Sequence, residues 1–186
     1  MLLQVFTFRD GLLARLAHDL RLSVGRFELT LERGRLQGWF DPSSLTVDGV
    51  AHGDRVDAAA LSAEDKLKIQ QTIARELLET SRHPRIELEG KLGQVDGQFV
   101  LDAKLRMHGV DRTLQIPLRL TALGMTAEIE FAPSLFGIPP YKAFGGAIRL
   151  QDRVLVRVHV LAERDKLAAL ASSREPYTFQ PGEARI

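Results

Sequence analysis

The chain has 186 residues, 45% of them hydrophobic and 26% charged, which suits one globular domain with an apolar core. Its 25 Lys and Arg residues nearly balance 24 Asp and Glu residues, and the net charge of +1 gives no electrostatic basis for binding nucleic acid or an anionic membrane. The absence of cysteine excludes disulfides, thiol nucleophiles and metal sites built from thiolates.

The first nine residues are apolar but do not have the features of a signal peptide. They lack a basic n-region, and no small-residue cleavage site follows them. No apolar run approaches the ~20 residues that a membrane-spanning helix needs. The sequence therefore predicts a first strand in a soluble, cytoplasmic protein without stable membrane insertion.

The next segment, residues 19–32, alternates like a strand but changes phase. Apolar residues hold the even positions from Leu20 to Val24 and the odd positions from Phe27 to Leu31. A β-bulge at residues 25–26 would produce this change and bend the strand. Such bends are typical of sheets that curl into barrels.

One long segment, residues 62–79, has the pattern of a helix. Ser62 is a plausible N-cap, with Asp65 three residues later in an imperfect capping box, and Pro84 blocks continuation. Apolar residues recur at helical spacing in a stripe formed by Leu67, Ile73, Leu77 and Leu78. The sequence predicts a helical insertion whose stripe packs on the sheet or covers an opening as a lid.

Period-two alternation dominates the second half of the chain. It is clearest in residues 98–107, 114–120 and 153–160, with shorter copies at 85–89 and 128–131. Glycine-containing segments at residues 94–97 and 107–111 predict hairpin turns. A weaker helix is predicted over residues 165–170, and the tail, residues 172–186, is predicted to be irregular.

About eight strands with one apolar and one charged face predict a mainly β, antiparallel protein that forms a single domain over residues 1–186. The apolar faces can be hidden by closing the sheet into a barrel or by forming a sandwich, and periodicity alone does not choose. An eight-stranded barrel can hold a slim ligand or be filled by its own side chains.

Five short sequence patterns follow one another between about Phe6 and Ala162. They are Ala-His-Asp-Leu at residues 17–20, Arg-Leu-Gln-Gly-Trp-Phe-Asp at 35–41 followed by Ser-Leu at 44–45, His-Pro-Arg-Ile-Glu-Leu at 83–88, Leu-Arg-Met-His-Gly-Val-Asp-Arg at 105–112, and Phe-Gly-Ile at 136–138. In their order and spacing, these patterns resemble those of the YceI-like family of lipid-binding β-barrels. The hairpin at residues 105–112 resembles the family's most telling feature.

The resemblance implies a lipocalin-like extended barrel that holds a polyisoprenoid or a similar long amphiphile, such as a quinone-like lipid, in its interior. Many members of the family are exported to the periplasm, and this chain differs from them in lacking a signal peptide. Its segment from Val50 to Thr80 is also longer and more helical than in the exported proteins.

For any single apolar residue that faces inward, core packing is the simpler interpretation. For the whole set, the resemblance favours a ligand-lined interior. The residues predicted to bind the ligand are Phe27, Leu29, Phe99, Leu101, Leu105, Ile116, Leu118, Ile129, Phe131, Ile148, Val156 and Val158, together with His18 and Tyr141.

The two polar residues in this set, His18 and Tyr141, are included for different reasons. His18 is followed by Asp19, but neighbours on a strand point to opposite faces, so a structural or head-group-binding histidine is favoured over a catalytic pair. Residues 136–142 form an apolar segment that caps the barrel or serves as a portal, where Tyr141 or Lys142 would meet a polar head group.

Other titratable residues do not predict chemistry. The remaining histidines, His52, His83, His108 and His159, lie far apart in sequence, so no metal site and no cofactor are predicted. The carboxylate pairs Glu87/Glu89 and Glu128/Glu130 alternate onto an outer, solvated face. No nucleophile elbow, phosphate loop or dinucleotide fingerprint is present.

Three functions are compatible with this pattern. The first is a non-catalytic carrier of a long apolar or amphiphilic molecule, the second is a lipid-modifying enzyme that uses the same cavity, and the third is a filled barrel that acts as a protein-interaction module. Leu155, on an otherwise charged face, would suit a homodimer contact, although a lone exposed leucine is also ordinary.

Overall fold

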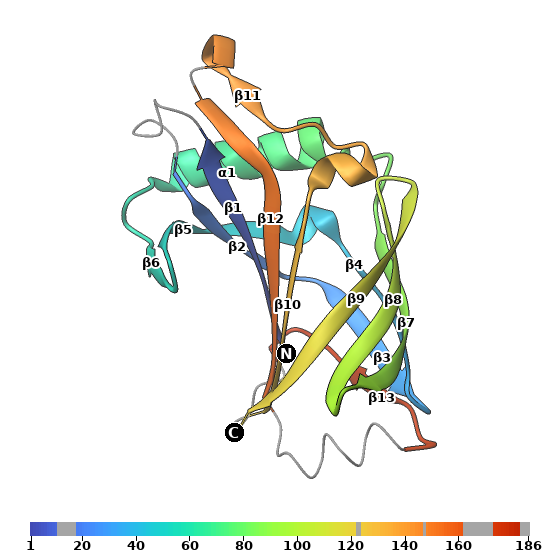
Figure 1. The fold of residues 1–186 in the computed structure, drawn as a ribbon. Helices are drawn as coiled ribbons and strands as arrows, with labels where there is room; N and C mark the ends of the chain where they lie inside the picture. Colours follow the sequence, from blue (N-terminus) through green and yellow to red (C-terminus); the bar gives the residue numbers. More distant parts are fainter. Residues whose placement is uncertain (11–17, 122–123, 147, 162–172, 183–186) are drawn as a thin grey trace.

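The computed structural model describes residues 1–10, 18–121, 124–146, 148–161 and 173–182. Within them, the chain is mainly β, with one α-helix that lies across one end of a curled antiparallel sheet (Figure 1). The strands are β1 (Leu2–Asp10), β2 (Leu20–Val24), β3 (Phe27–Glu32), β4 (Arg35–Phe40), β5 (Leu45–His52), β6 (Arg55–Asp57), β7 (Ile86–Val95), β8 (Gln98–Met107), β9 (Val110–Thr121), β10 (Gly124–Phe131), β11 (Lys142–Ala143), β12 (Ile148–Leu161) and β13 (Tyr177–Phe179).

Helical segments connect some of these strands. They are α1 (Ala63–Thr72), which continues into the π-helical turn η2 (Ile73–Leu77), and the short 3-10 segments η1 (Pro42–Ser44), η3 (Pro133–Phe136) and η4 (Phe144–Gly146).

The sheet closes into a barrel through one bent strand. Its hydrogen-bonded order is β13-β3-β4-β7-β8-β9-β10-β12-β1-β2-β5-β6, and β2 runs almost directly into β3. Where they meet, the Gly25 N–H donates to the Ser44 carbonyl (3.1 Å), and the Asp41 N–H donates to the Arg26 carbonyl (2.9 Å). β2/β3 therefore acts as one barrel strand, and β4/β5, interrupted by η1, as another. With β1, β7, β8, β9, β10 and β12 they make the barrel wall. The described residues form thirteen strands, more than the roughly eight that the sequence predicts, because the bend and η1 each divide one barrel strand and β6, β11 and β13 are additional.

The change of phase at residues 25–26 is confirmed. Leu22 before the bend and Leu29 after it are both buried, although one holds an even position and the other an odd one. Side chains fasten the bend: Arg26 donates to the Asp41 carboxylate at 2.6 Å, and the Asp41 carboxylate accepts from the Ser43 N–H at 2.8 Å as the N-cap of η1. This explains why an acidic residue precedes the Ser-Leu step.

Three two-residue hairpin turns follow the rule for β-hairpins that both central residues have positive φ. They are residues 33–34 (φ 50° and 71°), 96–97 (50° and 78°) and 108–109 (52° and 77°). The two hairpins predicted from glycine, at residues 94–97 and 107–111, are thereby confirmed. Because the strands alternate in direction, the turn at 108–109 lies at the opposite end of the barrel from the other two.

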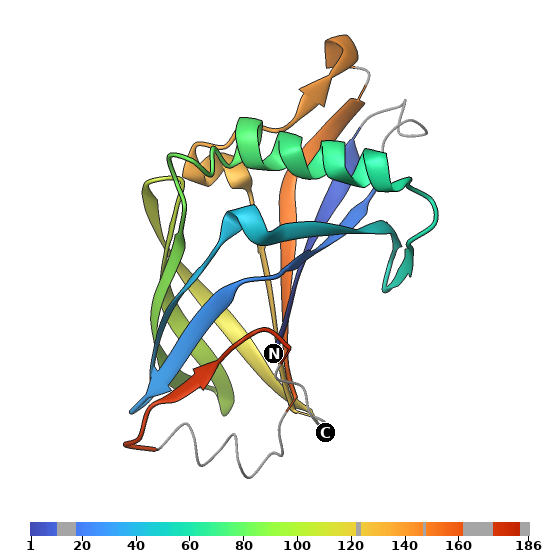
Figure 2. The ribbon, with the colours of Figure 1, turned by 180° about the vertical axis from the view of Figure 1, so that it is seen from behind.

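α1 crosses the end of the barrel that also carries β11, as both views show (Figures 1 and 2). It begins at the predicted N-cap, where the Ser62 hydroxyl accepts from the Asp65 N–H at 3.1 Å. The predicted stripe needs one correction: Leu67 is 53% exposed, and Ile69 takes its place beside Ile73. The inward stripe follows i, i+4 spacing from Ile69 to Leu77, and Leu67 is out of phase with it.

The predicted irregular tail is also corrected. Residues 177–179 form β13, which pairs antiparallel with β3 in the register Tyr177↔Leu31 and Phe179↔Leu29. The reason is an available edge, because β1 pairs with β2 but not with β3. Phe179 is buried there, and its ring lies 4.9 Å from that of Tyr177. The helix predicted over 165–170 lies outside the described residues.

Candidate functional site

An apolar cavity of about 750 Å³ occupies the inside of the barrel. It is lined by alternate residues of the barrel strands, because successive side chains of a strand point to opposite faces. The inner face of β12, for example, contributes Val154, Val156, Val158 and Val160. The side chains therefore do not fill this barrel.

The sequence predictions for the lining agree closely with the structure. Of the fourteen side chains predicted to bind a ligand, all but Phe27 line the cavity. Phe27 is buried elsewhere and packs against Phe40, with 6.1 Å between ring centroids. That the other thirteen contact a ligand stays a prediction.

The polar side chains of the lining gather toward the end that α1 covers. Three lie on α1 itself, one precedes β2 and one precedes β11, and the remaining two come from β1 and from the start of η1. They are Asp65, Lys68, Thr72, His18, Tyr141, Thr7 and Asp41. Lys142, the alternative to Tyr141 in the predicted portal, is exposed and does not line the cavity.

Thr7 is a polar lining residue with an unsatisfied group. Its Oγ1 is buried and has no hydrogen-bond partner among the described residues. Burying a hydroxyl without a partner costs about 1–3 kcal/mol. The cavity therefore offers one hydrogen-bonding group to whatever fills it.

Asp41 keeps its negative charge at the cavity wall. Partial burial acts to raise the pKa of its carboxyl group, but hydrogen bonds from Ser43 and the guanidinium of Arg26 outweigh this, and the pKa lies below its ordinary value. An ionised carboxylate already paired with Arg26 is a structural group at the bend of the barrel. It is not poised to donate a proton near neutral pH.

The other end of the cavity is apolar. Met1 and Phe179 line it there and are 5% and 7% exposed, and the Met1 amino group donates to the Gln180 carbonyl at 3.4 Å. The cavity therefore has an apolar end beside β13 and a mixed end beneath α1. An elongated molecule with one polar terminus would match this division.

The carboxylates that alternate outward are on the surface, as predicted. Glu128 pairs with Arg157 at 2.6 Å and Glu130 with Arg153 at 2.7 Å, both across the β10–β12 ladder. Neither glutamate lines the cavity.

The inner face of β1 was missed from sequence. Leu3, Val5 and Thr7 line the cavity, but the alternation is masked because Phe6 and Phe8 on the outer face are also apolar. The outer rings are covered by guanidinium groups: that of Arg157 lies 5.1 Å from Phe6 and that of Arg153 lies 4.3 Å from Phe8. The arginines that stack on these rings belong to β12, so the sequence of β1 by itself does not show that Phe6 and Phe8 are covered.

The histidines differ from their prediction in one respect. His83 and His108, far apart in sequence, are neighbours in the fold, with 4.3 Å between ring centroids. The turn at residues 108–109 brings His108 to the end of the barrel where the chain leaves η2 for β7. His18 lines the cavity and is exposed.

Two solved structures share this fold at low sequence identity. BcnA from Burkholderia cenocepacia aligns with a TM-score of 0.59 at 14% identity, over 87% of this chain and 95% of its own. A polyisoprenoid binding domain from Saccharophagus degradans, implicated in plant cell wall breakdown, aligns with a TM-score of 0.53 at 11% identity, over 84% of this chain and 89% of its own.

Sequence comparison gives the family. A comparison with curated proteins found no match. In the described part of the chain, no helix combines the length and apolar character needed to cross a membrane. The model of the YceI-like domain matches residues 21–162, which run from the second residue of β2 to just beyond the end of β12. On this match, and with the resemblance of its hairpins and strand entries, the chain belongs to the YceI-like domain family.

Proposed function

We propose that this protein is a non-catalytic carrier that holds a long apolar or amphiphilic molecule, such as a polyisoprenoid or a quinone-like lipid, inside its barrel. The observation that carries the proposal is the apolar cavity of about 750 Å³ whose polar lining side chains gather at the end under α1. An apolar tail would lie toward Met1 and Phe179, and a polar head group would lie among His18, Lys68 and Tyr141.

The cavity can supply enough binding energy without a special polar contact. At ~0.3 kcal/mol per heavy atom, a ligand of about 30 carbon atoms would gain ~9 kcal/mol. That free energy corresponds to sub-micromolar affinity. Selectivity would come mainly from the length and shape of the cavity, with the buried hydroxyl of Thr7 as a secondary hydrogen-bonding group.

The relatives support this class of ligand. One solved structure with the same fold is described as a polyisoprenoid binding domain. The cavity also favours the carrier over a barrel filled by its own side chains. For an enzyme, a titratable side chain would have to sit deep among the apolar residues, whereas the titratable lining residues lie at the α1 end or, like Asp41, are held in an ion pair.

Native mass spectrometry of the freshly purified chain tests the proposal. We expect a species heavier than the polypeptide by one long-chain molecule, and organic extraction would identify that molecule. Added polyprenyl alcohols and quinones of increasing chain length would show whether the cavity sets an upper limit.

A mass equal to that of the polypeptide, unchanged after these lipids are added, would refute the carrier. Turnover of a bound lipid into a product of different mass would instead establish the enzyme. Both results are read from the same spectra, so one preparation distinguishes them.

A further inference from the structure

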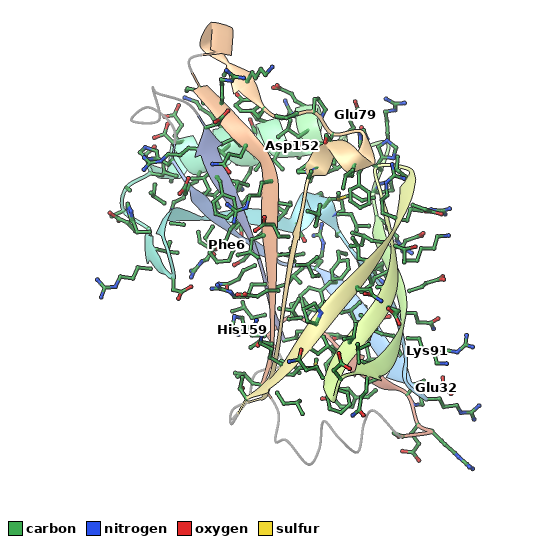
Figure 3. The ribbon with its side chains drawn as sticks, in the orientation of Figure 1. Phe6, Glu32, Glu79, Lys91, Asp152 and His159 are labelled. Carbon is green, nitrogen blue, oxygen red and sulfur yellow. The ribbon has the colours of Figure 1, made fainter. Side chains whose placement is uncertain are left out.

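Three side chains with metal-binding groups meet near the end of α1, outside the lining of the cavity. Within the described ranges, the ligand atoms of Glu79, His83 and His108 all lie within 4.8 Å of one another. Figure 3 labels Glu79 at the end of the molecule opposite Glu32 and Lys91. The three residues come from two distant parts of the chain, which the fold brings together.

The backbone holds each of the three in place. The Glu79 carbonyl accepts from the N–H groups of both Arg82 (2.8 Å) and His83 (2.9 Å), which closes a turn and places residues 79 and 83 one helical turn apart. Pro84 restricts the backbone of His83 to extended conformations. His108 occupies the first position of the hairpin turn between β8 and β9. The cluster is therefore preorganised.

Two of the three residues also have an uncommon conformation. Glu79 has φ of 42° and His108 has φ of 52°, in the left-handed region that residues other than glycine rarely adopt. In His108 the hairpin explains it. Glu79 directly follows Leu78, the C-cap of η2, and a left-handed residue at this place is a common way for a helix to end. Both conformations are therefore fixed by the local fold, which sets where the two side chains start.

His108 has a buried atom that lacks a partner. Its Nε2 is shielded from solvent and makes no hydrogen bond to the described residues. Buried polar atoms are nearly always satisfied, and an exception in a native fold calls for a water or an ion. The ring lies against that of His83, so a second imidazole is next to the unsatisfied one.

From this geometry we propose that Glu79, His83 and His108 form a binding site for a divalent transition-metal ion of the Zn²⁺ type. Two imidazoles and one carboxylate are a donor set typical of zinc sites with three protein ligands and a water. Zinc–ligand bonds of about 2.0–2.2 Å put tetrahedral ligand atoms roughly 3.4 Å apart. Side-chain rotation can close the difference from 4.8 Å.

Arg82 competes with a metal ion for the Glu79 carboxylate and can also orient that carboxylate. Its Nη1 donates to Glu79 Oε2 at 2.6 Å. The Arg82 side chain is 73% exposed, so its guanidinium can keep its bond to one carboxylate oxygen of Glu79 while the other oxygen turns toward the metal. Hydrogen bonds of this kind to a ligating carboxylate are usual around metal sites.

The site would join two parts of the barrel end. Glu79 directly follows Leu78, and His108 directly follows Met107; both preceding residues line the cavity. A bound ion would therefore fasten the end of the α1–η2 segment to the β8–β9 hairpin, just behind the cavity wall. This inference does not depend on the carrier proposal.

Metal titration of the full chain, without an affinity tag and stripped with EDTA, tests it. We expect one Zn²⁺ per chain at micromolar or tighter affinity, visible absorption of the Co²⁺ form typical of tetrahedral coordination, and a higher melting temperature with Zn²⁺. His108→Asn keeps a residue suited to the left-handed turn and should weaken Zn²⁺ binding at least about tenfold, the least that loss of even an outer-shell partner costs. Glu79→Gln should weaken it similarly.

His52→Gln is the matched control, because His52 is an exposed histidine at the end of β5. It should bind Zn²⁺ like the parent chain. Melting curves of the metal-free variants show whether each one folds. If His108→Asn does not fold, the affinity of Glu79→Gln for Zn²⁺ tests the site instead. Millimolar or non-stoichiometric binding by the parent chain, or equal affinities in parent and folded Glu79 and His108 variants, would overturn the site.

Discussion

Gly38 in β4 lies too close to β3 for any side chain. A Cβ built there would lie 2.0 Å from the Glu28 carbonyl oxygen and 2.7 Å from a methyl group of Leu29. Because that oxygen belongs to the backbone of the paired strand, Gly38→Ala should force β3 and β4 apart. We expect a loss of about 1–3 kcal/mol in the free energy of unfolding, measured by urea denaturation.

Gly93 in β7 provides the control for that substitution. The nearest atom to a Cβ at this position is the Val100 carbonyl oxygen at 4.0 Å. Gly93→Ala should be neutral or stabilise the fold by up to about 1 kcal/mol, since it restricts the unfolded chain. Equal losses in the two variants would show that the short distance at Gly38 does not matter.

Ala127 is a small residue where the cavity has room for a larger one. It lines the cavity from β10, opposite Leu118 and Val158 on the neighbouring strands. Ala127→Phe should fold, because the ring enters empty space, but it would displace roughly six ligand atoms. At ~0.3 kcal/mol each, lipid affinity should fall by roughly twentyfold to thirtyfold.

Binding of a polyprenyl probe, followed by fluorescence or native mass spectrometry, checks this. Glu128→Gln on the outer face of the same strand should leave the affinity unchanged. If folded Ala127→Phe bound the probe as tightly as the parent chain, the ligand would lie somewhere other than this cavity.

At the scale of elements, α1 replaces a missing strand at the edge of β5. The Gln70 side-chain oxygen accepts from the Val47 N–H at 2.9 Å, and the Lys66 ammonium donates to the Asp48 carbonyl at 3.0 Å and the Ala58 carbonyl at 2.8 Å. The bonds to Val47 and Asp48 occupy backbone groups of β5 that β6 does not reach, because β6 pairs with residues 50–52. An open edge would otherwise invite pairing with another chain.

Gln70→Leu should remove the acceptor of the Val47 N–H and cost about 1–3 kcal/mol, the usual penalty for an unsatisfied buried group. Hydrogen exchange at Val47 should become faster before the rest of β5 is affected. Gln71→Leu, at the exposed neighbouring position, should leave that amide as protected as in the parent chain. Unchanged exchange in Gln70→Leu would mean that the helix does not hold the edge.

Across the whole molecule, surface carboxylates make the fold sensitive to acid. Hydrogen bonds from Arg106 and Lys104 lower the pKa of Asp111 from 3.8 to about 2, and a bond from Arg153 lowers the pKa of Glu130. A carboxyl group whose pKa is lower in the folded state stabilises the fold above its unfolded pKa, and this contribution disappears as pH falls through the folded pKa. Stability should therefore drop between about pH 4 and pH 2.

Asp111→Asn should flatten this drop, because asparagine does not titrate. Urea denaturation midpoints, measured at several pH values from about 5 to about 2, would show this flattening, because that range covers the pKa of Asp111 in the unfolded and in the folded chain. At neutral pH the variant should be less stable than the parent chain by the part of the drop that it no longer shows, and this loss should be small because the ion-pair partners of Asp111 are exposed. Parallel pH profiles in the two proteins would contradict the assignment.

The strands and the lining could be predicted from sequence because they depend on local alternation. The bend at residues 25–26, the hairpins at 94–97 and 107–111 and eleven apolar lining residues follow from period two and from glycine in turns. What could not be predicted depends on partners distant in sequence. β13 forms because one edge of β3 is unpaired with β1 and can accept another strand. Leu67 faces outward because α1 is rotated toward Ile69. His83 lies next to His108 only once β7 and β8 have paired.

The weak burial of α1 separates how tightly a ligand is held from how fast it is exchanged. No residue of α1 is buried, whereas the barrel walls are, and segments with few buried contacts open at a small cost in free energy. The barrel would then determine the equilibrium constant, and transient opening of α1 would determine the lifetime of the complex. Gln70→Leu should accordingly speed both the uptake and the release of a polyprenyl probe, measured by stopped-flow transfer to and from vesicles, and leave the dissociation constant unchanged. A change in affinity without a change in these rates would mean that an element other than α1 controls ligand exchange.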